Sequence, residues 1–372
     1  MRKLYDFIVV GAGLSGAVAA YELTRKGYSV LVIEKADEIG GLCRCKIVNG
    51  IPVHSFGPHI FHTSNKEIWD FVNDKCEMLP YEHVVRAYYS EEMPDISLPI
   101  NINTVERIYG VHINNEDEVS DIIKDDIVKY DCPRTVEEQA LSTVGRRIYD
   151  VLIKEYTERQ WGKPCSELPA EILKRLQIRN TRNESYFSDK YVGIPKNGWN
   201  ELFDSLLSDC DIIKNTDYLS AKEYYNKIAG GVIYTGKIDE YFDYKFGRLE
   251  YIDHAFETAF GNDAKWSANS AVVNMTCYGD LFPLRTANYA LMYGHKSEKY
   301  YGGHIIEEYR RYDNANATMY PVPTLGKNIR LNMYRCLAEN EENVLFIGRN
   351  AEYKYYDMDD CIIRSKEAIG NE

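Results

Sequence analysis

The residues whose chemistry is clearest stand near the start of the chain. Gly11, Gly13 and Gly16 form a Gly-x-Gly-x-x-Gly fingerprint, and Glu34 closes the next apolar run. Bare glycines let a pyrophosphate approach the backbone at a helix N-terminus, and a carboxylate at that later position accepts hydrogen bonds from ribose hydroxyls. The spacing therefore predicts a dinucleotide-binding site within residues 5–34.

The residues after the fingerprint favour FAD over a nicotinamide nucleotide. Gly40 and Gly41 follow the acidic residue closely, as in flavoproteins whose FAD site continues past the second strand. Near the C-terminus, the apolar run 344–347 leads into Gly348-Arg349 and a predicted helix, which resembles the closing element of the glutathione-reductase-like FAD fold. The sequence contains no second Gly-x-Gly-x-x-Gly. A dedicated NAD(P)H domain is therefore not predicted.

Histidines and cysteines do not indicate a metal site. His59 and His62 lie close together in "GPHIFHTSN", but a zinc site normally needs three or more ligands and no third partner is evident. Buried structural histidines are the usual alternative, and His62 is assigned that role. The nine cysteines include one Cys-x-Cys pair, Cys43 and Cys45, and no Cys-x-x-Cys. Free thiols in a reducing compartment are therefore expected.

Composition narrows the class of protein. A net charge of −13 and a pI near 5.2 argue against a nucleic-acid partner, because phosphate backbones attract a surplus of Lys and Arg. No run of about 18 apolar residues occurs, and the N-terminus enters a predicted strand rather than a signal peptide. We therefore expect a soluble cytoplasmic enzyme without a membrane partner. The 31 tyrosines suit a polar ligand cleft, although interior tyrosines with satisfied hydroxyls are the commoner explanation for most of them.

Periodicity predicts the elements that hold these residues. Residues 5–10 and 30–33 are predicted to be buried parallel strands around a helix near 17–23. The stretch 65–162 is largely helical in pattern, and short β-type runs at 178–225 and 271–334 predict an antiparallel sheet. Within the helical stretch, capping boxes are predicted at Ser64 with Glu67 and at Thr135 with Glu138, and a helix break at Gly145.

The length of 372 residues favours two or three domains. The predicted fold is α/β, with a Rossmann-like FAD-binding domain of the glutathione-reductase type, an inserted helical domain and an antiparallel β-sheet domain. The expected boundaries are 1–64, 229–270 and 342–372 for the FAD-binding domain, 65–175 for the helical domain with a mobile substrate loop at about 163–180, and 176–228 with 271–341 for the sheet domain.

A set of short motifs in this chain resembles the UDP-galactopyranose mutase family. The motifs occur in the family's order along nearly the whole chain, and the ordered set is specific although each motif alone is weak. They are "FGPHIFHTSN" (56–65), "LPININT" (98–104), "EEQALS" (137–142), "YTERQWG" (156–162), "ELPAEILKR" (167–175), "YFSDKYVGIP" (186–195), "YTGKIDEYFDYKFGRLEY" (234–251) and "AEYKYYDM" (351–358).

The resemblance implies an isomerase that interconverts the pyranose and furanose forms of a nucleotide sugar, most simply UDP-galactopyranose and UDP-galactofuranose. In the family, N5 of reduced FAD forms an adduct with the sugar while UDP leaves, and the sugar ring opens and recloses without net redox. The flavin must first be reduced by external NAD(P)H or another reductant. The resemblance also suggests a homodimer and a role in cell-surface polysaccharide biosynthesis.

The family's site residues can be carried over where the motifs match. Arg175 and Arg285 match two diphosphate-binding arginines, and His59 matches a residue over the flavin; these three are the predicted catalytic residues. The predicted substrate-binding residues are Tyr156, Thr157, Trp161, His83, Tyr186, Phe187, Asn274, Tyr320 and Tyr355. The predicted cofactor-binding residues are Gly11, Gly13, Gly16, Glu34, Gly40, Gly41, His59, Arg349 and Asp357.

Four departures from the family pattern leave the sugar open. They are "TANYALMYG" (286–294), "NTRNES" (180–185) with a cation at Arg182, Ile252 where Arg is common, and Leu42 where Asn is common. The sugar could instead be N-acetylgalactosamine, arabinopyranose or a 6-deoxyhexose, and the nucleotide UDP or dTDP. Two other classes also remain: an amine-oxidase-type FAD oxidoreductase, and an FAD-binding protein that recognises a nucleotide sugar without turning it over.

Overall fold

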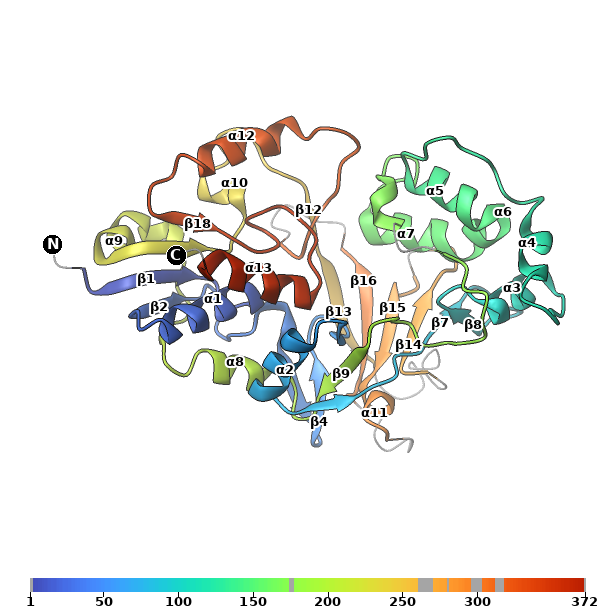
Figure 1. The fold of residues 1–372 in the computed structure, drawn as a ribbon, viewed down its shortest axis with the longest axis horizontal. Helices are drawn as coiled ribbons and strands as arrows, with labels where there is room; N and C mark the ends of the chain where they lie inside the picture. Colours follow the sequence, from blue (N-terminus) through green and yellow to red (C-terminus); the bar gives the residue numbers. More distant parts are fainter. Residues whose placement is uncertain are drawn as a thin grey trace.

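The protein is seen in a computed structural model that describes residues 3–173, 177–259, 270–279, 281–295, 303–311 and 318–370. Figure 1 shows a parallel sheet with its helices at one end, a group of helices at the other, and a larger sheet between them. The predicted catalytic Arg175 lies outside the described residues. Among the described helices, none combines the length and the apolar character needed to cross a membrane.

A five-stranded parallel sheet forms the first region, in the order β10-β2-β1-β11-β18. The two strands predicted at 5–10 and 30–33 are confirmed with those bounds. Strand β2 is buried along its whole length, as expected for a parallel strand covered on both faces. The strands are β1 (Tyr5–Val10), β2 (Val30–Ile33), β10 (Asp211–Ile213), β11 (Ala229–Tyr234) and β18 (Val344–Phe346).

Helices pack on this sheet and close its core. Helix α1 packs against α13 and α8, and its alanines share a buried core with Trp199 and Phe203. Asn65, not the predicted Ser64, caps α2, because its side chain accepts from the backbone N–H of Glu67. The helices are α1 (Leu14–Arg25), α2 (Lys66–Lys75), α8 (Asn200–Leu206), α9 (Lys222–Ile228), α10 (Ile238–Tyr241), α12 (Ile329–Ala338) and α13 (Met358–Gly370).

A six-stranded sheet forms the middle of the molecule, in the order β13-β16-β15-β14-β7-β8. The sequence predicts this sheet to be antiparallel. Its strand pairs are antiparallel except for β14 with β7, which is parallel. Directly paired residues point to the same face of a sheet. Asn274, Arg285 and Glu308 are therefore neighbours in one row across β14, β15 and β16. The strands are β7 (Val85–Tyr88), β8 (Ile96–Leu98), β13 (His254–Ala259), β14 (Val272–Met275), β15 (Arg285–Asn288) and β16 (Ile305–Arg310).

Three smaller sheets and a short helix connect these regions. The three-stranded sheet carries the "FHT" part of the histidine motif, and the β12–β17 pair brings Tyr320 opposite Ile252. The elements are β3 (Cys45–Val48), β4 (Ile51–His54), β5 (Phe61–Thr63), β6 (Met78–Pro80), β9 (Tyr191–Pro195), β12 (Tyr251–Ile252), β17 (Tyr320–Pro321) and α11 (Tyr289–Met292).

The helical region ends in the "YTERQWG" motif. The predicted capping box of Thr135 and Glu138 is confirmed, and Gly145 breaks the helix with a φ of +83°. A five-residue π-helical segment (Tyr149–Ile153) leads into α7, which stops at Gly162 with a φ of +69°. The helices are α3 (Ile102–Tyr109), α4 (Glu118–Ile123), α5 (Val136–Thr143), α6 (Gly145–Ile148) and α7 (Lys154–Trp161).

Strand pairing places three segments differently from the predicted domains. Strand β10 pairs with β2, so 211–213 lie in the parallel sheet rather than the antiparallel one. Strand β13, predicted within the FAD-binding domain, is an edge strand of the six-stranded sheet, and β7 and β8, predicted within the helical domain, join that sheet too. Local pattern predicts that a segment is a strand, whereas its partner depends on long-range packing that one sequence does not reveal.

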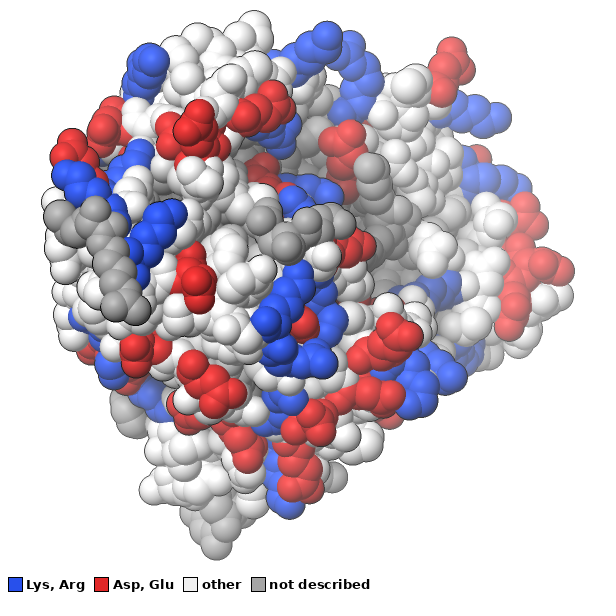
Figure 2. All heavy atoms as spheres, turned by 60° about the vertical axis from the view of Figure 1, so that its left-hand side comes forward, with Lys and Arg blue, Asp and Glu red and all other residues white. Residues whose placement is uncertain are grey.

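The surface carries charges of both signs. Figure 2 shows Lys and Arg interspersed with Asp and Glu over the face that it presents. Together with the net charge of −13, this arrangement gives no electrostatic basis for binding a polyanion along that face.

Candidate functional site

The glycine fingerprint forms a tight turn between β1 and α1. Gly11 has a φ of +99°, a conformation that L side chains rarely adopt. A Cβ on Gly16 would lie 2.0 Å from the carbonyl oxygen of Gly11, so only glycine allows this helix to approach the strand. Gly13 is the N-cap of α1 and makes no side-chain cap. The first N–H groups of α1 are thus suited to bind an anion.

Glu34 and the Gly40-Gly41 pair flank this turn. The two carboxylate oxygens of Glu34 accept from the backbone N–H groups of Ala12 and Ala36, each at 2.7 Å. These bonds fix the carboxylate at the end of β2, and its remaining lone pairs can accept from ribose hydroxyls. A Cβ on Gly41 would lie 3.0 Å from Cα of Gly13. The two glycine segments therefore form one cradle, which fits the dinucleotide part of FAD.

Arg349 follows the turn after β18, as the sequence predicts. Its guanidinium donates to the carbonyl oxygen of Tyr356 at 2.7 Å and lies 5.1 Å and 5.0 Å from the ring centroids of Tyr320 and Tyr355. The two tyrosine rings stack at 6.2 Å. Arg349 therefore links the predicted cofactor site to two predicted substrate-binding rings. Asp357 is half-buried just before the start of α13.

His59 is a neutral ring in this environment. Its Nδ1 lies 2.9 Å from the carbonyl oxygen of Gly57, and the backbone N–H of His59 donates to Nδ1 of His54 at 3.0 Å. Burial, aided by the charges of Arg349 and Arg285, lowers the pKa of His59 to about 4. A neutral ring next to a carbonyl carries its proton on Nδ1, which leaves Nε2 as an acceptor.

Arg285 is gathered with Tyr156 and Asn274. Nη2 of Arg285 donates to the hydroxyl of Tyr156 at 2.8 Å, which joins β15 to α7. Asn274 is the cross-strand partner of Arg285 and is buried. The Tyr156 hydroxyl accepts this bond, so its own proton can still be donated to a ligand. The structure thus places three of the predicted residues together.

Glu308 and His254 complete this cluster, and the sequence analysis missed both. Glu308 is 6 % exposed. Its Oε1 lies 2.5 Å from Nδ1 of His254, and its Oε2 lies 3.7 Å from Nε of Arg285. Although burial opposes ionisation, Arg285 and then His254 hold the pKa of Glu308 down to about 2. The sequence gives no sign of Glu308, because "IIEEYR" (305–310) holds two adjacent glutamates and no local motif distinguishes one from the other.

Helix α7 presents different residues to the site and to the neighbouring loop. Trp161 packs edge-on against Tyr320, with ring centroids 6.4 Å apart. Arg159 is 4 % exposed and donates to the carbonyl oxygens of Met275 and Phe282, so it ties α7 to the segment that precedes Arg285. Thr157 is buried beside these residues.

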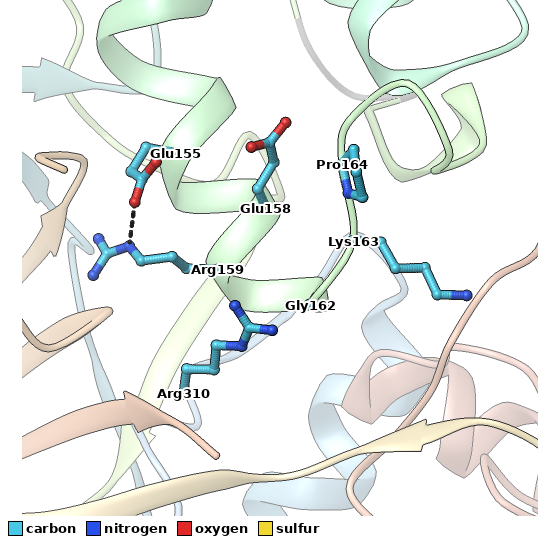
Figure 3. A pocket seen from close by; sticks show the side chains of 7 residues that line it. All are labelled: Glu155, Glu158, Arg159, Gly162, Lys163, Pro164 and Arg310. Carbon is cyan, nitrogen blue, oxygen red and sulfur yellow. Dashed lines mark ion pairs between the residues drawn. The ribbon is translucent and has the colours of Figure 1, made fainter. Parts of the chain in front are cut away.

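The end of α7 also borders a hollow of about 260 Å³. Figure 3 shows Arg310 reaching toward Gly162 from the sheet side, with Glu155 paired to Arg159 on the helix. Glu158 and Lys163 complete the charged lining. Tyr156 leaves α7 toward Arg285. The hollow therefore adjoins the predicted site without including Arg285 or Tyr156.

The predicted base-binding pair, Tyr186 and Phe187, packs with His83 and His62. Phe187 stacks between two histidine rings, 3.9 Å from His62 and 5.5 Å from His83. His62 is fixed by Asp189, 2.8 Å from its Nδ1, which is a structural contact. Tyr186 is 38 % exposed. Of the pair, Tyr186 has the more open ring face.

Some residues that depart from the family pattern lie next to the predicted site, and others lie away from it. Arg182 makes two 2.8 Å contacts with the carboxylate of Glu106, so this cation serves the helical region and does not reach Arg285. Ile252 is buried, and its Cδ1 lies 3.5 Å from the place that a Cβ on Gly162 would occupy. Tyr289, from the segment 286–294, is fully buried against His54. These two departures therefore change packing next to the site.

Several buried polar atoms near Arg285 have no hydrogen-bond partner among the described residues. They are Oδ1 of Asn274, Nδ1 of His83 and Nε of Arg285. Buried polar groups are nearly always hydrogen-bonded, so a polar ligand that supplies both donors and acceptors would complete this region. Among the described residues, no group of three His, Cys, Asp or Glu side chains could hold a metal ion.

Comparison with known proteins agrees with this arrangement. A family model described as UDP-galactopyranose mutase matches 151–355, and one described as an NAD(P)-binding Rossmann-like domain matches 9–74. A probable UDP-galactopyranose mutase of Klebsiella pneumoniae is 35 % identical over 95 % of this chain and 91 % of that protein. A dTDP-fucopyranose mutase of Escherichia coli is 33 % identical, over 97 % and 96 %.

A crystal structure of reduced UDP-galactopyranose mutase has the same fold, with a TM-score of 0.66 over 99 % of this chain and 95 % of that one at 16 % identity. The glycine cradle, Glu34 and Arg349 suit FAD. The chain therefore belongs to the UDP-galactopyranose mutase family of FAD-dependent nucleotide-sugar isomerases.

Proposed function

We propose that this protein interconverts the pyranose and furanose forms of a nucleotide sugar, most simply UDP-galactose, while its FAD is reduced. One observation carries the proposal to this chain's own residues. Arg285 is joined to Tyr156, and Oδ1 of its cross-strand partner Asn274 and Nδ1 of His83 are buried without hydrogen-bond partners among the described residues. A diphosphate and a sugar supply the acceptors and hydroxyls that such a region lacks.

Each residue has a role that follows from its chemistry. Bound FAD in its reduced form supplies the nucleophile for the sugar's anomeric carbon. Arg285, together with Arg175, holds the diphosphate by charge-assisted hydrogen bonds while it leaves and returns. Tyr156 can donate its hydroxyl proton to a phosphate oxygen, and the exposed ring of Tyr186 can stack on the base. His59 presents an acceptor nitrogen toward the flavin side.

A substrate screen tests the proposal. Dithionite-reduced enzyme would be incubated without oxygen with UDP-galactopyranose, UDP-N-acetylgalactosamine, UDP-arabinopyranose and dTDP-fucopyranose, and the furanose products separated by chromatography. We expect UDP-galactopyranose to be converted. If no nucleotide sugar were converted, and if oxidised enzyme in a separate aerobic assay consumed oxygen with an amine substrate, an amine-oxidase-type activity would replace the mutase.

A dTDP-linked 6-deoxyhexose is the second candidate substrate. The supporting observation is that the dTDP-fucopyranose mutase of E. coli matches this chain nearly as well as the UDP-galactopyranose mutase of K. pneumoniae. Buried Ile252, beside the end of α7 where the family commonly has Arg, also makes this part of the site less polar. A higher kcat/KM for dTDP-fucopyranose than for UDP-galactopyranose in the same screen would decide for this candidate.

Trp161 offers a specific test of substrate binding. We expect Trp161→Ala to raise the KM for the nucleotide sugar by about tenfold, because loss of the ring removes apolar contact next to Tyr320. FAD should stay bound, since Trp161 packs against the core of the helical region and Tyr320. Steady-state kinetics and the flavin absorbance of the purified variant check both points. A colourless protein would assign Trp161 to cofactor retention instead.

We also propose that the enzyme works in the cytoplasm as a homodimer and supplies a furanose sugar for cell-surface polysaccharide. The family resemblance supports these points. Sedimentation of the FAD-loaded protein at about twice the mass of one chain, 43.0 kDa, is the expected result for the dimer, and sedimentation as a single chain would contradict it.

A further inference from the structure

The ring of His254 lies where both of its nitrogens meet acceptors. Nδ1 is 2.5 Å from Oε1 of Glu308, and Nε2 is 3.1 Å from the carbonyl oxygen of Gln160. The side chain of His254 is 1 % exposed, so water does not provide an alternative partner. A carbonyl and a carboxylate can only accept. Arg285 favours the ionised form of Glu308, and next to a carboxylate and a carbonyl each nitrogen carries a proton, which makes the ring an imidazolium.

These contacts close a ring of interactions between α7 and the six-stranded sheet. Gln160 and Tyr156 are one turn apart on α7. Gln160 accepts from His254, which pairs with Glu308; Glu308 pairs with Arg285 across β15 and β16, and Arg285 donates back to Tyr156. Each link joins a different element: α7, β13, β16 and β15. Arg285 is thus held against α7 in two ways: by its own hydrogen bond to Tyr156, and through Glu308 and His254 to Gln160.

The charges in this ring determine what Arg285 can offer to a ligand. Without His254, the carboxylate of Glu308 would be paired with Arg285 alone, and the two charges would cancel. With His254 protonated, two cations face one carboxylate, and one positive charge remains for an incoming anion. Because charges interact strongly in a buried region of low dielectric, this difference of one positive charge has a large effect on the binding of an anion.

We propose that His254 is a positioning residue that neutralises Glu308 and so leaves the guanidinium of Arg285 oriented and available for the diphosphate of the substrate. The inference rests on the proposed nucleotide-sugar site. It goes beyond the family pattern, because His254 lies in "YIDHAFET", next to the departure at Ile252. His254 does not touch substrate; it acts through Glu308.

A double-mutant cycle on the FAD-loaded enzyme tests this. The variants are His254→Gln, Glu308→Gln and the two combined, with UDP and dTDP titrated separately and followed by the change in flavin absorbance. His254→Gln should weaken binding of the preferred diphosphate by about tenfold, the size of one charge-assisted hydrogen bond. In the Glu308→Gln background the same change should alter binding less than about twofold, because there is no carboxylate left to neutralise.

A control variant and the pattern of results distinguish failure of this inference from failure of the proposed function. His112→Gln, at an exposed His–Glu pair 3.0 Å long on the helical region, should leave binding unchanged. Equal weakening by His254→Gln in both backgrounds, or none in the parent background, would overturn the inference. Absence of binding and of turnover in the parent enzyme, with FAD bound, would instead overturn the proposed function.

If a variant does not fold, the pH dependence of UDP binding to the unaltered oxidised enzyme tests the proposal instead. Although burial opposes its charge, Glu308 and the Gln160 carbonyl raise the pKa of His254 above its ordinary value. Among the described residues, three other titratable groups face His254: Arg285, Arg310 and Tyr320. Arg310 is the cross-strand partner of His254 on β16, and the pKa of Tyr320 is also raised. Affinity for UDP should fall as pH rises above 7.5, where the phosphates are already fully ionised. Constant affinity from pH 7.5 to 9.5 would contradict the proposal.

Discussion

Arg285→Ala is expected to lower kcat/KM for the nucleotide sugar by at least about a hundredfold while FAD stays bound. The guanidinium donates to the hydroxyl of Tyr156, and its cross-strand partner Asn274 has a buried Oδ1 without a hydrogen-bond partner among the described residues. Removing one strong donor to a developing anion costs roughly 100- to 1000-fold in rate. Steady-state kinetics with reduced enzyme measure the loss, and the flavin absorbance reports the cofactor.

Two further variants sharpen this result. Arg285→Lys keeps the charge but lacks the planar fork, so its activity should lie between the parent and Arg285→Ala. Arg25→Ala, at an exposed arginine 3.7 Å from Glu22 on α1, should match the parent. If Arg285→Ala lost its yellow colour, the residue would be structural, and the assignment of Arg285 to the diphosphate would be wrong.

Glu308→Gln is expected to lower the free energy of unfolding by about 3 kcal/mol near neutral pH and to reduce turnover. The change keeps the shape of the side chain but leaves Arg285 and His254 without their shared carboxylate. Removing one partner from a buried ion cluster typically costs about 3–5 kcal/mol, and His254 can release its proton to limit the loss. Urea unfolding followed by fluorescence measures the difference.

The lowered pKa of Glu308 determines how the stability difference between the parent and Glu308→Gln changes with pH. In the folded protein the pKa of Glu308 is lowered from 4.5 to about 2, which corresponds to about 3 kcal/mol. A group whose pKa is lowered on folding stabilises the protein above its unfolded pKa and loses that contribution as pH falls. The parent should therefore exceed Glu308→Gln in stability at pH 5 and above, and the difference should vanish toward pH 2.

Glu307→Gln is the matched control for Glu308→Gln. Glu307 precedes Glu308 on β16, points to the opposite face of the sheet and is half-buried beside the hydroxyl of Tyr309. Its effect on stability should be about 1 kcal/mol or less. Equal losses from the two changes would contradict a special role for the cluster at Arg285.

Sequence reasoning located the cofactor cradle well because its constraints are local. Gly11 and Gly16 must be glycine for backbone reasons that spacing alone expresses, and the strands on both sides of them were predicted with the observed bounds. The ordered motifs also predicted the family and several residues that the structure brings together, including Tyr156 with Arg285 and Tyr320 with Tyr355.

The parts that were missed depend on contacts between distant segments. Glu308 is the second of two adjacent glutamates in "IIEEYR" (305–310), and its importance follows only from β15 and β13 lying on either side of it. Arg182 stands out in the sequence as an extra cation in the departing segment 180–185, and the structure shows that Glu106 on α3 binds it. A charge pattern in one segment does not show which distant segment supplies the partner. Arg175 remains a prediction, since it lies outside the described residues.

The most direct test of the central claim is conversion by reduced enzyme without net redox. Flavin absorbance and furanose formation would be followed together, without oxygen, over many turnovers of UDP-galactopyranose or dTDP-fucopyranose, with oxidised enzyme as the comparison. We predict furanose formation only when the flavin is reduced, and a flavin that is still reduced after many turnovers. Stoichiometric oxidation of the flavin, or equal conversion by oxidised enzyme, would contradict the account.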